Sequence, residues 1–187
     1  MNDISDLAGA VGACRLCADR FAATATAHRP RPVTWFQSEA RLLIVGQAPG
    51  MRVHLAGRPY ADRSGDRLRD WMGLDAEAFY DRSRIAIAPM AFCFPGYDAA
   101  GADLPPPRLC AETWRARVLT DIAPEVTLLI GGHARTAEAQ LLVMFVGRLP
   151  FDAQLVYCLV AQVSMALVAL VDRLIDEYLT ADGWLLL

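Results

Sequence analysis

Three short apolar runs, each ending in glycine or proline, constrain the fold of this chain more than any other feature. They are LLIVG at 42–46, RIAIAP at 84–89 and TLLIGG at 127–132. Continuous apolar runs of this length, bounded by turn residues, are typical of strands that are buried on both faces of a parallel sheet. We therefore predict three parallel strands in the interior of one domain.

Helical patterns alternate with these runs. Ser64 is a candidate N-cap for a helix that ends at Gly73, and residues 109–122 fit a second helix. Strands that alternate with helices predict an α/β layered domain. Ligands of such sheets bind at the carboxyl ends of the strands. In this chain the loops at those ends begin at Gln47, Pro89 and Gly131.

Composition excludes several classes of protein. The chain has 187 residues, 55% hydrophobic and 21% charged, which suits one folded domain and excludes a disordered or fibrous chain. The net charge of −3 is not that of a bulk nucleic-acid coat protein. The first residues lack the basic and apolar regions of a secretion signal, so we expect a cytoplasmic protein.

The sequence changes character after Arg135. We divide the chain into an α/β core at 1–135 and an apolar, helical tail at 136–187, which is either part of the same domain or appended to it. Residues 154–171 carry no formal charge, but their glutamines and serine do not suit a lipid-facing helix. We expect a helix at 154–179 that packs on the sheet or on a second copy of the chain, and no membrane span.

Four of the five cysteines form a candidate metal centre. Cys14 and Cys17 form a CxxC pair before the first strand, while Cys93 and Cys110 flank the loop after the second strand. A CxxC turn lets two thiolates bind one metal centre, and four thiolates suit either a zinc ion or a cubane iron–sulfur cluster. Spacing alone does not choose between these two. We expect Cys158, in the apolar tail, to be remote from this centre.

The loop after the first strand is a candidate ligand site. Its turn, GQAPG, consists of Gly46, Gln47, Ala48, Pro49 and Gly50. The following GRPYADRSGDRL brings an aromatic ring, a carboxylate and a helix N-terminus close together, which suits a base and an anion. His54 lies in the same loop, and an imidazole there could take part in proton transfer.

Arginines surround this loop. Since the chain has no lysine, every fixed positive charge is a guanidinium. Those near the loop either bind phosphates or form an ion-paired, solvated face with the neighbouring aspartates. They are Arg52, Arg58, Arg63, Arg67 and Arg69.

Taken in order, these motifs resemble the uracil-DNA glycosylase superfamily. The motifs are CRLC, LLIVGQAPG, GRPY, SGDRL, Cys93, Cys110 and APEVTLLIGGHA. They resemble most closely the bacterial and archaeal branches that carry an iron–sulfur cluster, families four and five. The resemblance covers about residues 12–135.

The resemblance implies a three-layer αβα sandwich with a short central parallel sheet. It also implies a 4Fe–4S cluster on the four cysteines, with zinc as the alternative, and DNA containing uracil or another damaged base as the substrate. Such a protein extrudes the base and hydrolyses its bond to the sugar. Tyr60 matches the aromatic residue that stacks on the flipped base, and Asp62 matches a carboxylate that handles water.

The chain also departs from the family pattern. Gln47 stands where iron–sulfur members often have glutamate, and Pro89 stands where many have an asparagine that reads the base edge. The family's His-Pro-Ser motif is absent from the sequence, whose three histidines are all upstream of residue 136. Two alternatives to a glycosylase therefore stay open. One is a catalytically impaired iron–sulfur module that binds nucleic acid, and the other is a zinc-stabilised interaction protein.

Overall fold

Four parallel strands form the centre of the molecule. The computed structural model of the chain describes residues 4–38, 40–131 and 156–159, and the fold is that of these residues. The strands lie in the order β2-β1-β3-β4. Their bounds are β1 Leu42–Val45, β2 Ile85–Ile87, β3 Val126–Ile130 and β4 Val156–Leu159. The three strands predicted from apolar runs are confirmed, each to within two residues at either end.

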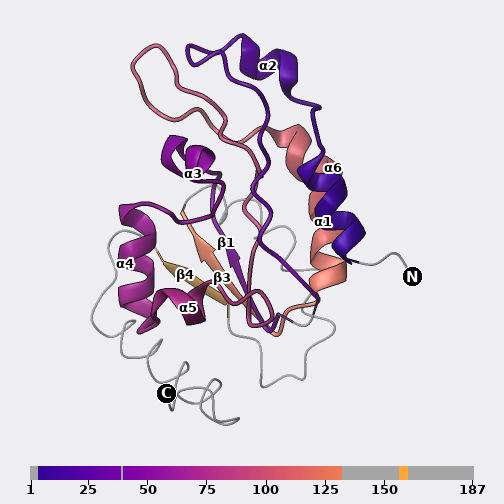
Figure 1. Ribbon diagram of the computed structural model, residues 1–187, viewed down its shortest axis with the longest axis vertical. Coiled ribbons are helices and arrows are strands. Elements are labelled where there is room, and N and C mark those ends of the chain that lie inside the picture. The colour runs from indigo at the N-terminus through magenta and orange to yellow at the C-terminus, as the bar shows by residue number, and fades with distance from the viewer. Residues whose placement is uncertain (1–3, 39, 132–155, 160–187) are drawn as a thin grey trace.

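Helices cover both faces of this sheet, with α1 and α6 on one side and α4 and α5 on the other (Figure 1). Two further helices, α2 and α3, lie beyond the carboxyl end of β1 (Figure 1). The bounds are α1 Ile4–Gly12, α2 Ala18–Ala22, α3 Met51–Ala56, α4 Arg63–Met72, α5 Ala76–Phe79 and α6 Arg108–Ile122. The three-layer αβα sandwich is therefore confirmed, and α6 corresponds to the helix predicted at 109–122.

Side chains point alternately to the two faces of the sheet along each strand, and this produces two separate hydrophobic cores. In β1, Leu43 packs with α1 and α6, whereas Ile44 packs with α4 and α5. Successive side chains of a strand point to opposite faces, so a run that is apolar throughout must be covered on both. This is why the LLIV sequence requires a helical layer on each side.

Helix α4 begins two residues earlier in the chain than the sequence indicated. We predicted Ser64 as its N-cap, but the cap is Asp62, whose Oδ1 accepts hydrogen bonds from the N–H groups of Ser64 and Gly65 at 3.0 and 3.1 Å. Aspartate and serine are nearly equal as N-caps, so the sequence could not rank them. Gly73 ends the helix as predicted, with a left-handed φ of 63°.

The tail prediction is wrong at the four tail positions that the structure describes. Residues 156–159 form β4, which pairs in parallel with β3, and not part of a helix. A strand at the edge of a sheet gains backbone hydrogen bonds from the neighbouring strand. The apolar sequence alone does not show that such a neighbour is present. The rest of the predicted helix lies outside the described residues. Within the described ranges no helix is long and apolar enough to cross a membrane.

Gly65 allows the chain to turn tightly into α4. A Cβ built on this residue would overlap the carbonyl oxygen of Tyr60, which lies directly against it. Gly65 is buried, so an added side chain could not move into solvent to avoid the overlap. Gly9 offers a matched comparison, because it is exposed within α1 and a Cβ there meets nothing within 4 Å.

We predict that Gly65→Ala destabilises the protein by about 1–3 kcal/mol, the usual cost of an overpacked site. Gly9→Ala should stabilise it by about 0.5–1 kcal/mol, because alanine is the better residue in a helix interior. Urea unfolding of both variants measures the two effects. Equal stabilities for the two variants would contradict the tight turn at Gly65.

Candidate functional site

The four candidate ligand cysteines line one cavity. Cys14 and Cys17 enter it from the segment between α1 and α2, Cys93 from the loop after β2, and Cys110 from α6. The other lining side chains are all apolar. They are Val11, Leu16, Phe21, Pro30, Pro32, Ala91, Phe92, Pro107, Leu109 and Trp114. Four thiols separated by up to 96 positions in the sequence thus share one apolar enclosure.

In the absence of a cation, burial in this cavity makes the charged thiolate form of the cysteines unfavourable. Burial and the neighbouring Cys110 raise the pKa of Cys93 to about 12, and burial raises the pKa of Cys110 to about 11. Burial and Cys14 also raise the pKa of Cys17. A bound cation would offset these costs by pairing with the thiolates.

The donor set fits a metal centre. Besides the four sulfurs, the backbone N–H of Phe92 donates to Cys110 Sγ at 3.5 Å, and a backbone hydrogen bond from Arg31 lowers the pKa of Cys93. Such hydrogen bonds to sulfur are typical of iron–sulfur sites. Among the described residues no three His, Cys, Asp or Glu side chains are already arranged to hold a metal ion. The four cysteines of the cavity therefore remain a candidate ligand set.

The GQAPG turn lies at the carboxyl end of β1 and is held by the loop after β2. Met90 N–H donates to the Gly46 carbonyl at 2.9 Å, and Ala91 N–H donates to the Gln47 carbonyl at 3.2 Å. The N–H groups of Gln47, Ala48 and Gly50 donate to no residue in the described ranges. Three backbone donors thus remain for a ligand at this edge of the sheet.

Tyr60 is the aromatic residue of this site. Its hydroxyl lies against Gly46, where a Cβ would approach it to 2.8 Å. Its ring meets that of Phe79 edge-on at 6.0 Å between centroids, which joins it to the core beneath α4 and α5. Burial and the Asp62 carboxylate raise its pKa, so the hydroxyl is neutral at physiological pH. Tyr60 therefore places an uncharged, half-buried aromatic ring beside the GQAPG turn.

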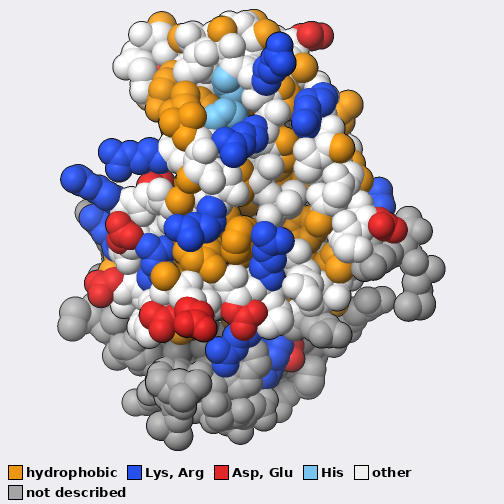
Figure 2. All heavy atoms as spheres, in the orientation of Figure 1, with side chains coloured by type: hydrophobic (Ala, Val, Ile, Leu, Met, Phe, Trp, Pro, Cys, Tyr) orange, Lys and Arg blue, Asp and Glu red, His pale blue; other side chains and the backbone are white. Residues whose placement is uncertain are grey.

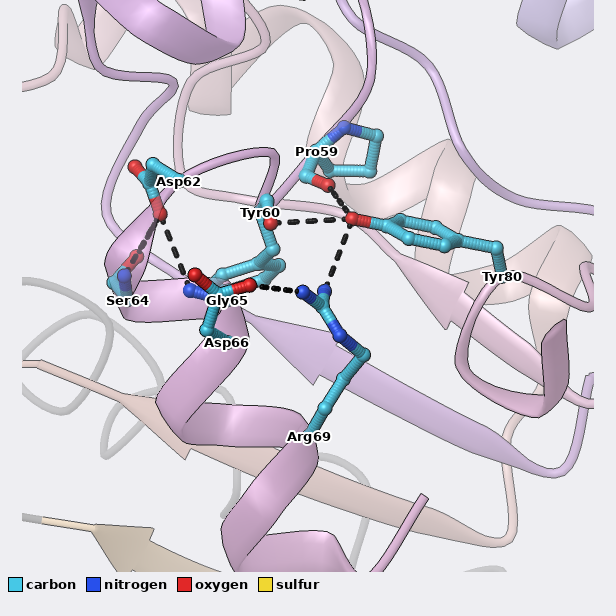
Figure 3. Close-up of polar contacts among 8 residues, drawn as sticks. All are labelled: Pro59, Tyr60, Asp62, Ser64, Gly65, Asp66, Arg69 and Tyr80. Atoms are coloured by element: carbon cyan, nitrogen blue, oxygen red, sulfur yellow. Dashed lines mark hydrogen bonds and ion pairs between the residues drawn. The ribbon is translucent and has the colours of Figure 1, made fainter. Parts of the chain in front are cut away.

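The backbone of Tyr60 is strained and is held by its neighbours. Its φ of 53° is left-handed, which is uncommon for a residue with a Cβ. The Tyr80 hydroxyl lies 2.9 Å from the Pro59 carbonyl and 3.1 Å from the Tyr60 carbonyl, and it accepts a hydrogen bond from Arg69 at 3.2 Å (Figure 3). A strained residue held from several sides is a common feature of functional sites.

Asp62 combines a structural role with a place at the site. Its Oδ1 accepts the two N–H groups of the α4 N-terminus and the Ser64 hydroxyl (Figure 3). No described residue bonds to Oδ2. One carboxylate oxygen thus caps the helix, and the other remains for water or a ligand.

Asp103 is a candidate site residue that the sequence did not indicate. Its Oδ2 lies 3.8 Å from the position that a Cβ on Gly50 would take, and burial together with the Asp62 carboxylate raises its pKa. A small hairpin returns it to the site, with Asp98 N–H bonded to the Ala102 carbonyl and Leu104 N–H to the Gly96 carbonyl, both at 2.9 Å. The only sequence signal was a carboxylate in a loop expected at the ligand edge.

His54 belongs to a different cluster from Asp62 and Tyr60. It lies on α3, and its ring contacts are with His28 at 5.3 Å and Phe94 at 6.0 Å between centroids. Burial, His28 and Arg31 lower its pKa, so the imidazole is neutral at pH 7. Its buried Nδ1 has no hydrogen-bond partner among the described residues. The proton-transfer role expected of His54 has no contact with Tyr60 or Asp62 to support it.

Arginines gather over α3 and α4, with apolar side chains between them (Figure 2). Of the five arginines in the candidate loop and helix, Arg69 forms an ion pair within the described residues, with Asp66 at 2.6 Å. The other four are exposed and form none there. The alternative of a fully ion-paired face is therefore not what the described residues show.

A comparison with known protein families matches residues 33–168 to the model of the Uracil DNA glycosylase superfamily. The match contains the GQAPG turn, Tyr60, Asp62, Cys93 and Cys110. It begins after the CxxC pair, so it does not distinguish the iron–sulfur branches. It also extends beyond residue 135, where our motif comparison ended, and includes β4.

The Asp62 cap leads to a stability prediction. Asp62→Ala removes the acceptor of two helix N–H groups and should cost about 0.5–2 kcal/mol, whereas Asp62→Asn keeps an acceptor and should cost little. Thermal unfolding of the two variants provides the comparison. If the alanine variant is as stable as the asparagine variant, Oδ1 is not an effective cap.

Proposed function

The chain belongs to the uracil-DNA glycosylase superfamily, and from that premise we propose that it excises uracil or another deaminated base from DNA. The reaction is hydrolysis of the N-glycosidic bond. The observation that carries this proposal is the convergence of Tyr60, Asp62 and Asp103 on the GQAPG turn. An aromatic ring, free backbone donors and carboxylates are the groups that such a reaction requires.

The base is held by the ring and the turn. A nucleotide must leave the stack before its glycosidic bond can be attacked, and the extruded base is then bound by stacking and by hydrogen bonds to its edge. The Tyr60 ring supplies the stacking surface, and the N–H groups of the GQAPG turn supply donors to base carbonyls. These donors also stabilise the negative charge that the departing base acquires.

The carboxylates act on the sugar and on water. Cleavage of the glycosidic bond places positive charge on the sugar, which a nearby carboxylate stabilises. Asp62 Oδ2 takes this position and orients the attacking water, while Oδ1 keeps the carboxylate fixed on the helix. Gln47 cannot accept a proton, so Asp62 serves as the base, and Asp103 adds a second negative charge nearby.

The four cysteines hold a 4Fe–4S cluster in this proposal, with zinc as the alternative. The thiols, the apolar lining and the N–H to sulfur contact support such a group. When bound, the group supplies a structural clamp between the N-terminal segment, the loop after β2 and α6. No catalytic step passes through it.

A second candidate function is a DNA-binding module of the same fold without turnover. Two substitutions within the family pattern favour it. Gln47 is not ionisable, and Pro89 has neither an amide side chain nor an N–H with which to read a base. A cleavage assay on uracil-containing single- and double-stranded DNA separates the two functions.

For the glycosylase we predict that Asp62→Asn lowers single-turnover excision by about 10²–10⁴-fold, the usual range for loss of a general base. The variant keeps the helix cap, so its folding and DNA affinity should change little. Single-turnover kinetics with a uracil-containing oligonucleotide provide the measurement. An unchanged rate in this variant would reject Asp62 as the base, and no excision by the parent protein would favour the binding module.

For the metal centre we expect anaerobically purified protein to be brown, with absorbance near 400 nm and about four iron atoms per chain. Cys93→Ser should lose most of this iron, whereas Cys158→Ser should keep it. One zinc atom per chain and no colour would establish the alternative. Protein that binds neither metal would show that the cavity is only a packing feature.

A further inference from the structure

Two arginines and two aromatic rings form a stacked row outside the core of α4 and α5. Arg82 Cζ lies 4.0 Å from the centroid of the Trp35 ring, and Arg58 Cζ lies 4.4 Å from the centroid of the Tyr80 ring. The two rings meet edge-on at 5.4 Å between centroids. We call the four residues Arg58, Tyr80, Trp35 and Arg82 the stacked row.

The stacked row packs against the core beneath it and extends to the backbone of Tyr60. Both rings pack against the core cluster that contains Phe79 and Leu68. The Tyr80 hydroxyl lies within hydrogen-bonding distance of the Tyr60 carbonyl (Figure 3). The Tyr80 end of the stacked row therefore lies beside the backbone of Tyr60.

The two guanidiniums of the stacked row keep their donors available. Arg58 and Arg82 are exposed and pair with no carboxylate in the described part of the chain. The Asp81 carboxylate, adjacent to Arg82 in sequence, instead accepts the N–H and hydroxyl of Ser83 at 2.9 and 2.6 Å. A guanidinium that stacks through its face leaves its in-plane N–H groups free for the oxygens of a phosphate.

We propose that the stacked row binds the sugar–phosphate backbone of the DNA strand whose extruded base reaches Tyr60. Arg58 binds a phosphate close to that base and Arg82 binds a phosphate farther along the same strand. The rings hold each guanidinium in position, so little side-chain freedom is lost on binding. The inference rests on the proposed function for its DNA partner, but it concerns binding and not hydrolysis.

The test measures the salt dependence of binding to a fluorescein-labelled, undamaged oligonucleotide, single-stranded and duplex, by fluorescence anisotropy. Each lost phosphate contact should reduce the slope of log K against log salt by about 0.7 for a single strand and about 0.9 for a duplex. Arg58→Ala and Arg82→Ala should each show that reduction, and the double variant should show both. Arg58→Lys and Arg82→Lys should keep the slope but weaken binding, because lysine keeps the charge and lacks the planar fork.

Arg117→Ala is the matched control. Arg117 is an exposed arginine on α6, which packs on the opposite face of the sheet. Its loss should leave the slope unchanged, and thermal unfolding should show that every variant is folded. A slope that Arg58→Ala and Arg82→Ala leave unchanged would overturn the inference.

Excision and binding can fail separately. If the parent protein excises uracil but neither arginine affects the slope, the proposed phosphate binding by the stacked row is wrong and the glycosylase function is supported. If the arginines determine the slope but no base is excised, the phosphate binding is supported and the glycosylase function is wrong. A parent protein that binds neither oligonucleotide at low salt overturns both.

Discussion

The site depends on one strained residue, Tyr60, and on the contacts that hold it. A left-handed tyrosine is costly, and it persists only where neighbours leave no alternative. Gly65 has no Cβ to collide with the Tyr60 carbonyl, and the Tyr80 hydroxyl lies within hydrogen-bonding distance of the Pro59 and Tyr60 carbonyls. This arrangement turns the Tyr60 ring toward Gly46 and lets Asp62, two residues later, begin α4. The ring and the carboxylate therefore take their positions from the same turn.

The loop after β2 connects the cysteine cavity to the GQAPG turn at the carboxyl edge of the sheet. The loop that carries Cys93 also supplies the N–H groups of Met90 and Ala91, which hold the GQAPG turn. The hairpin beyond Cys93 then returns Asp103 to Gly50. A metal centre on the four thiols would fix both ends of this loop, because Cys93 and Cys110 flank it. In this way a group that takes no part in chemistry can support the geometry of the site.

Charge is distributed unevenly around this site. The Asp62 carboxylate is close enough to raise the pKa of Asp103, and a pair of carboxylates suits the proposed reaction, which builds positive charge on the sugar. The exposed arginines of the stacked row lie outside this pair and match a polyanion. In the proposed complex, a DNA strand meets positive charge along its backbone and negative charge at the sugar whose glycosidic bond is cleaved.

The sequence by itself determined the layers of the fold, because runs such as LLIV are apolar at every position and so predict strands covered on both faces. It also predicted that CxxC and two later cysteines share one site, and the structure places these four cysteines along one cavity. Only the tertiary structure decided that Asp62 and not Ser64 caps α4, since the two are nearly equal as caps. It also decided that residues 156–159 form a strand, because the strand's backbone hydrogen bonds come from β3. Likewise, only the structure shows that Asp103 reaches Gly50, because the direction in which a hairpin points depends on the packing of the chain around it. Local sequence patterns indicate which side chains prefer burial or a turn, whereas contacts between distant segments depend on the packing of the whole chain.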